Sequence, residues 1–161
     1  MHVRKPALSV GVGLLLAGCA IWAPSVQPGM SRAEVLSRLG TPTAVVALPT
    51  GERLQYSSQP AGQTATMVDL DASGHVLQAR QVLTATDLAR IQPGWSRADV
   101  LREFGPPALI DHVATWDGDV WTYRWQGDGG MFYWVYFDRA GRVGRTQQGM
   151  EFFNAPNRTR R

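Results

Sequence analysis

The stretch VQPGMSRAEVL at residues 26–36 returns, 65 positions later, as IQPGWSRADVL at residues 91–101. Both copies run on to a Gly-x-Pro sequence, at residues 40–42 and 105–107. The chain is therefore an internal duplication, and the repeated stretch decides how it is organised.

Each copy of the stretch predicts a turn followed by a short helix. The Pro-Gly pair indicates the turn. Ser31 or Ser96 stands three residues before Glu34 or Asp99, which is the spacing of a capping box. Apolar residues at three- and four-residue spacing then form one apolar helix face, and the following glycine and proline end the helix. Two helices of one design begin two similar units.

Four strand-like runs follow each of these helices, rich in β-branched and aromatic residues and bounded by turns. The predicted strands are 44–48, 53–57, 64–70 and 76–83 in the first unit, and 109–113, 120–125, 131–137 and 142–147 in the second. The turns at residues 71–74 and 138–141 match at an offset of 67, so the second unit holds two additional residues between its helix and its third strand. A short helix over residues 86–91, capped by Thr86, precedes the second copy. Its counterpart in the first unit is expected to be stunted.

These elements predict an α+β fold of two tandem helix–helix–four-strand units, with the helices packed on one face of antiparallel sheet. Each unit alone is near the size at which a core is marginal, so the units are expected to share one core. The predicted organisation is a signal peptide (1–18), a lipidated tether (19–25), a first repeat (26–85), a second repeat (86–150) and a basic C-terminal tail (151–161).

The N-terminus has the features of a secretory signal. Arg4 and Lys5 precede an apolar run over residues 7–16, which is too short to span a membrane. The run ends in Leu-Ala-Gly-Cys, which resembles the lipobox of bacterial lipoproteins; the alternative is a lone cysteine in an ordinary signal peptide. The resemblance implies that Cys19 is the first mature residue and bears a diacylglycerol and an N-acyl chain, enough for stable anchoring. Ala20, rather than aspartate, implies by resemblance to enterobacterial sorting the periplasmic face of the outer membrane of a Gram-negative cell.

The repeated Pro-Gly-x-Ser-Arg-Ala stretch, the Gly-x-Pro sequence, Tyr56 or Tyr123 and the closing Asp-x-x-Gly-x-Val resemble the SmpA/OmlA (BamE-like) family of outer-membrane lipoproteins. This resemblance implies a non-catalytic scaffold or accessory in envelope or β-barrel outer-membrane protein assembly, acting through protein–protein contacts. The tandem arrangement differs from single-domain members and is similar in architecture to the β-lactamase inhibitor protein. That similarity implies the alternative, a tethered inhibitor or binding module for a periplasmic enzyme or a cell-wall ligand.

Charge and chemistry argue against other function classes. The expected mature chain has 14 arginines, no lysine and 13 acidic residues, with no cationic cluster on its body, so no nucleic acid is expected. His75 and His112 lack ligand-spaced histidine or cysteine partners, and the adjacent Asp111 and His112 should point to opposite faces of a strand. The turns at 117–119 and 128–130 are too short to surround calcium. Neither an enzyme, a metal nor a cofactor beyond the lipid is expected.

The most informative side chains are aromatic, and nine of the 15 lie between residues 116 and 137. Strand alternation directs Val135 and Phe137 to the core, with Val68 and Leu70 as their counterparts in the first unit. The opposite face then receives the predicted partner-binding residues Phe132, Trp134, Tyr136 and Arg124, where the first unit has Ala65, Met67 and Asp69. The alternatives are that the segment 151–153 covers this face, or that a slip of one residue exchanges core and surface.

Overall fold

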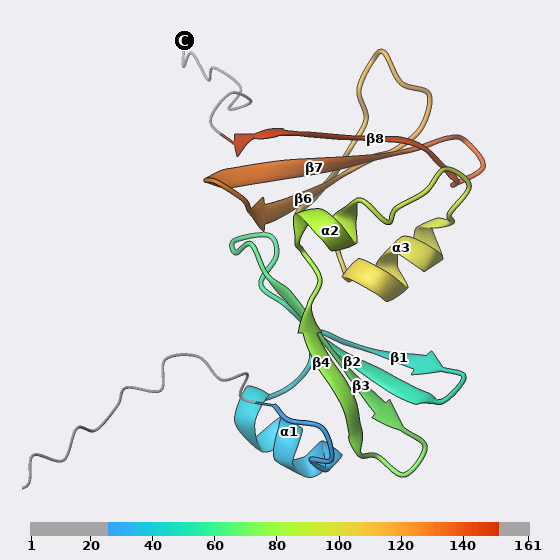
Figure 1. The fold of residues 1–161 in the computed structure, drawn as a ribbon. Helices are drawn as coiled ribbons and strands as arrows, with labels where there is room; N and C mark the ends of the chain where they lie inside the picture. The colour runs from blue at the N-terminus through green and yellow to red at the C-terminus, as the bar shows by residue number, and fades with distance from the viewer. Residues whose placement is uncertain (1–25, 152–161) are drawn as a thin grey trace, which may run out of the picture.

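The computed structural model describes residues 26–151, which form two units of antiparallel sheet (Figure 1). The first unit contains α1 (Arg32–Leu39), β1 (Ala44–Leu48), β2 (Gly51–Ser57), β3 (Ala65–Asp71) and β4 (Val76–Gln81). The second contains α2 (Ala85–Leu88), α3 (Arg97–Phe104), β5 (Leu109–Asp111), β6 (Val120–Gln126), β7 (Gly130–Phe137) and β8 (Val143–Met150). The four strands of each unit pair in chain order as a meander.

The expected fold class was wrong. The described chain is mostly β, two four-stranded antiparallel sheets with three short helices, and it does not form two helix–helix–four-strand units with helices on one face of a sheet. The reason lies at the helix boundaries: each repeated stretch has a Pro-Gly turn before its helix and a glycine directly after it, so α1 and α3 are eight residues long. The helix before α3 has four residues, and the part of the first unit that the structure describes has no such helix.

The strand predictions were close, and their errors are informative. All eight predicted strands occur, but β5 ends at Asp111 and β8 continues to Met150. The two additional residues of the second unit therefore lie in the β5–β6 loop. The predicted cap of α2 was wrong by two positions: Thr84, not Thr86, accepts a hydrogen bond from the Asp87 N–H (3.1 Å), which leaves Thr86 inside the helix.

The repeated stretch has the same structural role in both units. Ser31 and Ser96 cap α1 and α3 through complete capping boxes, as predicted. Just before them, the Gly29 N–H donates to the Val76 carbonyl and the Gly94 N–H to the Val143 carbonyl, both at 2.8 Å. Each stretch is thus joined to the last strand of its own sheet.

Other repeated residues hold the helix ends. The hydroxyl of Tyr56 donates to the Gly40 carbonyl (3.1 Å), and that of Tyr123 donates to the Gly105 carbonyl (2.9 Å). Tyr123 is fully buried, and burial raises the pKa of its hydroxyl. The motif residues therefore form the frame of each unit.

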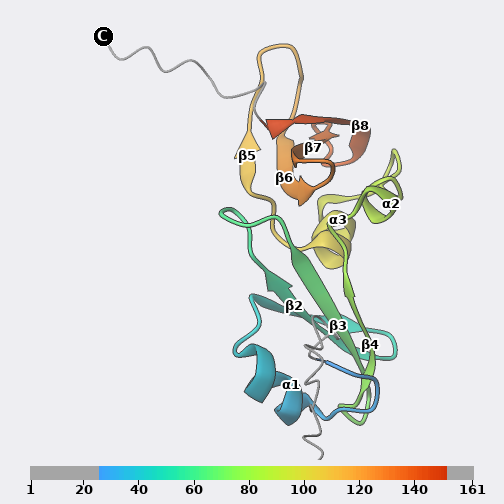
Figure 2. The same ribbon diagram turned by 60° about the vertical axis from the view of Figure 1, so that its left-hand side comes forward.

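The elements stack in four layers. From bottom to top, Figures 1 and 2 show α1, the β1–β4 sheet, α3 with α2 beside it, and the β5–β8 sheet. Helix α3 therefore lies between the two sheets. The far side of the β5–β8 sheet has no helix over it among residues 26–151.

The buried residues form two clusters rather than the single shared core that was expected. The smaller belongs to the first unit and includes Val35, Val68 and Leu70. The larger contains most of the second unit's core, Val135 and Phe137 among it, and also takes in Ala65 and Met67 of β3. The two units are thus packed together through the larger cluster.

Polar contacts reinforce this packing between the units. The Arg53 guanidinium forms two hydrogen bonds with the Asp69 carboxylate (2.5 and 2.9 Å) and a third with the Arg102 carbonyl of α3 (3.0 Å). Burial alone would raise the pKa of Asp69, but hydrogen bonds from Arg53 and Gln78 hold that pKa below its ordinary value. The Gln55 amide also donates to the Leu101 carbonyl (2.9 Å). The first sheet is therefore fixed against the C-terminal end of α3.

Candidate functional site

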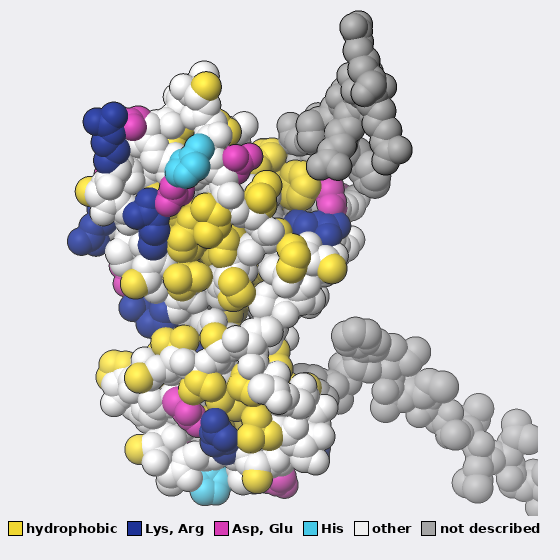
Figure 3. All heavy atoms as spheres, turned by 180° about the vertical axis from the view of Figure 1, so that it is seen from behind, with side chains coloured by type: hydrophobic (Ala, Val, Ile, Leu, Met, Phe, Trp, Pro, Cys, Tyr) yellow, Lys and Arg dark blue, Asp and Glu magenta, His cyan; other side chains and the backbone are white. Residues whose placement is uncertain are grey.

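The outer face of the β5–β8 sheet forms a groove of about 750 Å³. Its lining comes from β5, β6, β7 and four flanking segments: Pro60, Ala108, Leu109, Asp111, Val113, Val120, Thr122, Arg124, Phe132, Trp134, Tyr136 and Glu151. All four predicted partner-binding residues are in this set. Seen from behind, hydrophobic side chains gather on this half of the molecule with charged side chains around them (Figure 3).

Strand alternation in β7 produces the aromatic row, as predicted. Tyr133, Val135 and Phe137 are buried in the larger cluster, whereas the residues between them face the groove and are half-buried. The rings of Phe132 and Trp134 are 5.9 Å apart at an angle of 54°. The register did not slip, and the row lines the groove. Residues 152 and 153, which the other alternative places over this face, lie outside the described residues.

Trp116, which was not among the predicted site residues, supports one end of the row. It comes from the β5–β6 loop, and its ring lies edge-on to Tyr136 with centroids 5.4 Å apart. Its indole N–H donates to the Phe137 carbonyl (2.7 Å). The Arg145 guanidinium lies 3.8 Å from the centre of the Tyr136 ring, a cation–π contact. The Tyr136 ring is thus already in contact with Trp116 and Arg145. Phe132 and Trp134 contact mainly each other, so they are the more accessible rings of the row.

At the other end, Arg124 is held by its own chain rather than left free. Its guanidinium pairs with Glu151 (2.5 Å) and donates to the carbonyls of Pro60 (3.0 Å) and Ala61 (2.6 Å). Its backbone is bound as well: the Gln59 side-chain amide donates to the Arg124 carbonyl (2.7 Å) and accepts from the Arg124 N–H (3.2 Å). Arg124 therefore shapes the end of the groove, and its charge is already neutralised.

The equivalent face of the first unit is not open. At an offset of 67, Phe132, Trp134 and Tyr136 correspond to Ala65, Met67 and Asp69, which are 0%, 1% and 7% exposed. Met67 and Asp69 lie beneath the C-terminal end of α3. A Cβ added at Gly105 would sit 3.6 Å from Met67, and Arg53, which pairs with Asp69, also donates to the Arg102 carbonyl. The same sheet position is an internal interface in one unit and a surface in the other.

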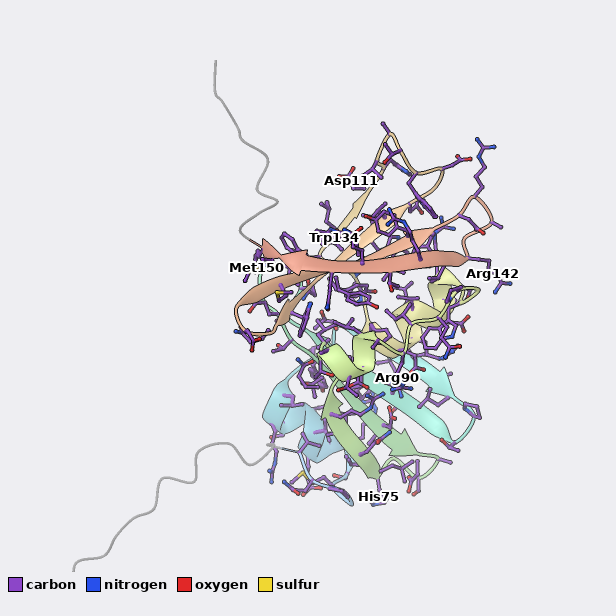
Figure 4. All side chains as sticks on the ribbon, turned by 45° about the horizontal axis from the view of Figure 1, so that its top comes forward. His75, Arg90, Asp111, Trp134, Arg142 and Met150 are labelled. Carbon is purple, nitrogen blue, oxygen red and sulfur yellow. The ribbon has the colours of Figure 1, made fainter. Side chains whose placement is uncertain are left out.

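The two described histidines, His75 and His112, do not form a catalytic arrangement with each other. His75 lies at the opposite end of the molecule from Asp111 (Figure 4). The His75 ring contacts the Ser73 hydroxyl (3.1 Å) in the β3–β4 turn, while His112 is 77% exposed with its ring 3.4 Å from Asp119. The turns at 117–119 and 128–130 connect β5 to β6 and β6 to β7, and residues 26–151 contain no group of three or more potential metal ligands.

Several predictions concern residues outside those described. These are the signal peptide, Cys19 with its lipid chains, the tether up to residue 25 and the tail beyond Glu151. Within the described range, no helix is both long enough and apolar enough to cross a membrane.

Comparison with known protein families and with curated proteins finds no match to this chain. Among solved structures, the chain is similar to a DUF4309 family protein (YjgB) from Bacillus subtilis subsp. subtilis str. 168. The TM-score is 0.32 and the identity 12%, over 75% of this chain and 78% of that one. A likeness at this level carries no functional argument.

Proposed function

We propose that this protein is an outer-membrane-anchored lipoprotein that acts as a non-catalytic scaffold or accessory in envelope or β-barrel outer-membrane protein assembly. The proposed anchor is Cys19, and the proposed contact surface is the groove on the β5–β8 sheet. The Leu-Ala-Gly-Cys sequence and the repeated SmpA/OmlA-like motif support the class and the location.

The observation that carries the proposal is the aromatic row of the groove. Two half-buried rings, Phe132 and Trp134, face outward beside a hollow lined mainly by apolar side chains. Exposed apolar surface of this kind, rimmed by polar residues, is typical of protein–protein contact sites, and tryptophan and tyrosine are common anchors in them. The repeat-equivalent face is buried, so this surface is available only in the second unit.

The second candidate is a tethered inhibitor or binding module for a periplasmic enzyme or a cell-wall ligand. The concave form of the site favours it, because a hollow accepts a protruding loop or a small ligand as readily as a flat partner surface. Both candidates use the same residues, and the identity of the captured molecule separates them.

The test places a photoreactive amino acid at Trp134 in the full chain and crosslinks in membranes. A matched probe at Val45, 50% exposed on the first unit, is the control. Recovery of barrel-assembly proteins from position 134 alone supports the scaffold. Recovery of a periplasmic hydrolase or a cell-wall enzyme supports the second candidate, and the same products from both positions contradict both.

The anchor is tested separately by Cys19→Ser. This variant should leave the membrane fraction and appear in the periplasm, because it loses every acyl chain. If it still fractionates with membranes and the wild-type chain takes up no lipid label, the proposed anchor is wrong.

A further inference from the structure

One border of the groove is a free strand edge. β5 is the terminal strand of its sheet, so the outer edge of its backbone has no neighbouring strand within residues 26–151. Its apolar residues are unusually open, with Leu109 54% and Ile110 53% exposed. Soluble proteins usually protect such an edge with lysine, proline or a covering loop, because it is a template for pairing with another chain.

Beside β5, the chain itself closes the part of the β6 edge that β5 does not reach. β5 pairs with only the first three residues of β6, and Pro107 before it has no N–H with which to continue the ladder. The Gln59 amide takes its place and bonds to both the N–H and the carbonyl of Arg124. A side-chain amide carries the same donor and acceptor as a peptide bond, so Gln59 closes the edge of β6. The free outer edges of this sheet within residues 26–151 are then those of β5 and β8, and β5 is the one that lines the groove.

The charge beside this edge is negative. Asp111 lines the groove, and its carboxylate accepts the N–H of its neighbour His112 (2.7 Å). No ion pair to Asp111 is formed within residues 26–151, whereas Arg124 at the far end is neutralised by Glu151. The available charge at the β5 rim therefore complements a basic side chain.

We propose that the partner contributes an extended peptide segment that adds as a strand to the outer edge of β5 and places a basic side chain beside Asp111. This inference rests on the proposed function of the groove. Strand addition takes affinity from main-chain hydrogen bonds and specificity from alternate side chains. Here the alternate side chains meet Leu109 and Asp111, while the aromatic row binds a further apolar group of the same partner.

The experiment measures the binding of labelled peptides to the full chain in detergent by fluorescence anisotropy. The probes are an octapeptide alternating valine and lysine, one alternating valine and glutamate, and the valine–lysine peptide with every backbone nitrogen methylated. The valine–lysine peptide should bind best, and methylation should weaken it by at least about tenfold, since it removes the donors that pair with β5. Asp111→Asn should weaken the same peptide by about tenfold, and the matched charge change Asp128→Asn, in the β6–β7 turn, should not.

Equal binding of the methylated peptide overturns strand addition at β5, and equal binding of the glutamate peptide overturns the placement of a basic side chain beside Asp111. Enhanced binding in a full chain carrying Phe152→Ser and Phe153→Ser also overturns strand addition by a partner, since the occupant would then be the chain's own tail. If crosslinking from position 134 captures a partner but no peptide binds, the proposed function stands and the strand-addition inference fails. If the valine–lysine peptide binds as expected but crosslinking captures nothing specific, the inference stands and the proposed function fails.

Discussion

The two sheets of this protein are built alike but use the same face in opposite ways. In the first, the face that carries Met67 and Asp69 is covered by the C-terminal end of α3. In the second, the matching positions hold Trp134 and Tyr136 and line an open groove. The duplicated frame is the same in both, because the capping boxes and the glycine contacts are repeated.

The difference shows what duplication can provide. One copy's outer face serves to join the units, and its residues are suited to burial: a paired arginine and aspartate, a glutamine bonded to helix carbonyls, and a methionine. The other copy's face is released from that role. Its valine, threonine and aromatic side chains line the groove, and under the proposed function divergence of one face separates the joining of the units from partner binding.

The largest loss of stability is expected from a substitution on the covered face of the first sheet. Arg53→Ala removes one partner of a buried ion pair and leaves Asp69 charged and unpaired beneath α3. The free energy of unfolding should fall by about 3–5 kcal/mol, measured by urea denaturation. Arg139→Ala is the control: its ion pair with Asp117 is exposed, so a loss within about 0.5 kcal/mol is expected. Equal losses in the two variants would mean that the Arg53 pair is not buried in solution.

Matched truncations compare the faces directly. Met67→Ala leaves a cavity in the larger cluster and should cost about 2–5 kcal/mol of unfolding free energy. Trp134→Ala, at the equivalent position, removes a half-buried ring from the groove and should cost about 1 kcal/mol or less. If Trp134→Ala lowered the stability more than Met67→Ala in thermal denaturation, the second face would also be buried inside the protein.

The two repeated helix caps, unlike the two sheet faces, should lose equal stability when the same residue is replaced in each. Ser31→Ala and Ser96→Ala each remove an N-cap hydroxyl from a complete capping box. Each should lower the unfolding free energy by about 1 kcal/mol, measured by chemical denaturation. A large cost at one position and none at the other would contradict an equal role for the two copies.

The smallest effect is a pH dependence at α3. Hydrogen bonds from the Ser96 side chain and backbone, and then from Arg102, lower the pKa of Asp99 from 3.8 to about 2. A carboxylate with a lowered pKa stabilises the fold fully above its unfolded pKa, and that contribution is lost as the pH falls through its folded pKa. The stability advantage of wild type over Asp99→Asn should be constant above about pH 4 and disappear near pH 2, measured as the urea midpoint against pH. An unchanged advantage at pH 2 would rule out the carboxylate as its source.

The duplication, the strands and the core side of each strand could be predicted from sequence, because they depend on local pattern. Val135 and Phe137 alternate with the groove residues over a strand only eight residues long, and that alternation decided their sides. The fold class was not predicted correctly. The helix ends at Gly40 and Gly105 were predicted, but the small share of helix in the whole fold and the position of α3 between two sheets depend on contacts between distant segments. The prediction added leading helices that the described chain has only once, as the four-residue α2.

The candidate site was predicted in part. The aromatic row and Arg124 lie together, but the engagement of Arg124 by Gln59 and Glu151 depends on segments 65 and 27 residues away, which no local pattern reports. The cover of the first face was missed for the same reason, since it comes from the other unit. One signal was present. Arg53 and Asp69 lie opposite each other in adjacent strands, and such an ion pair contributes substantially to stability only if the face that carries it is buried.

The central claim is that the second sheet's aromatic row is a binding surface and not a core. It is tested most directly by Trp134→Ala with Tyr136→Ala, carrying the photoreactive probe at Leu109 on the groove rim, with melting temperature and partner capture measured on the same preparation. Capture should be lost while the melting temperature falls by less than about 5 °C. Capture that persists, or a melting temperature that falls as far as that of Met67→Ala, would contradict it.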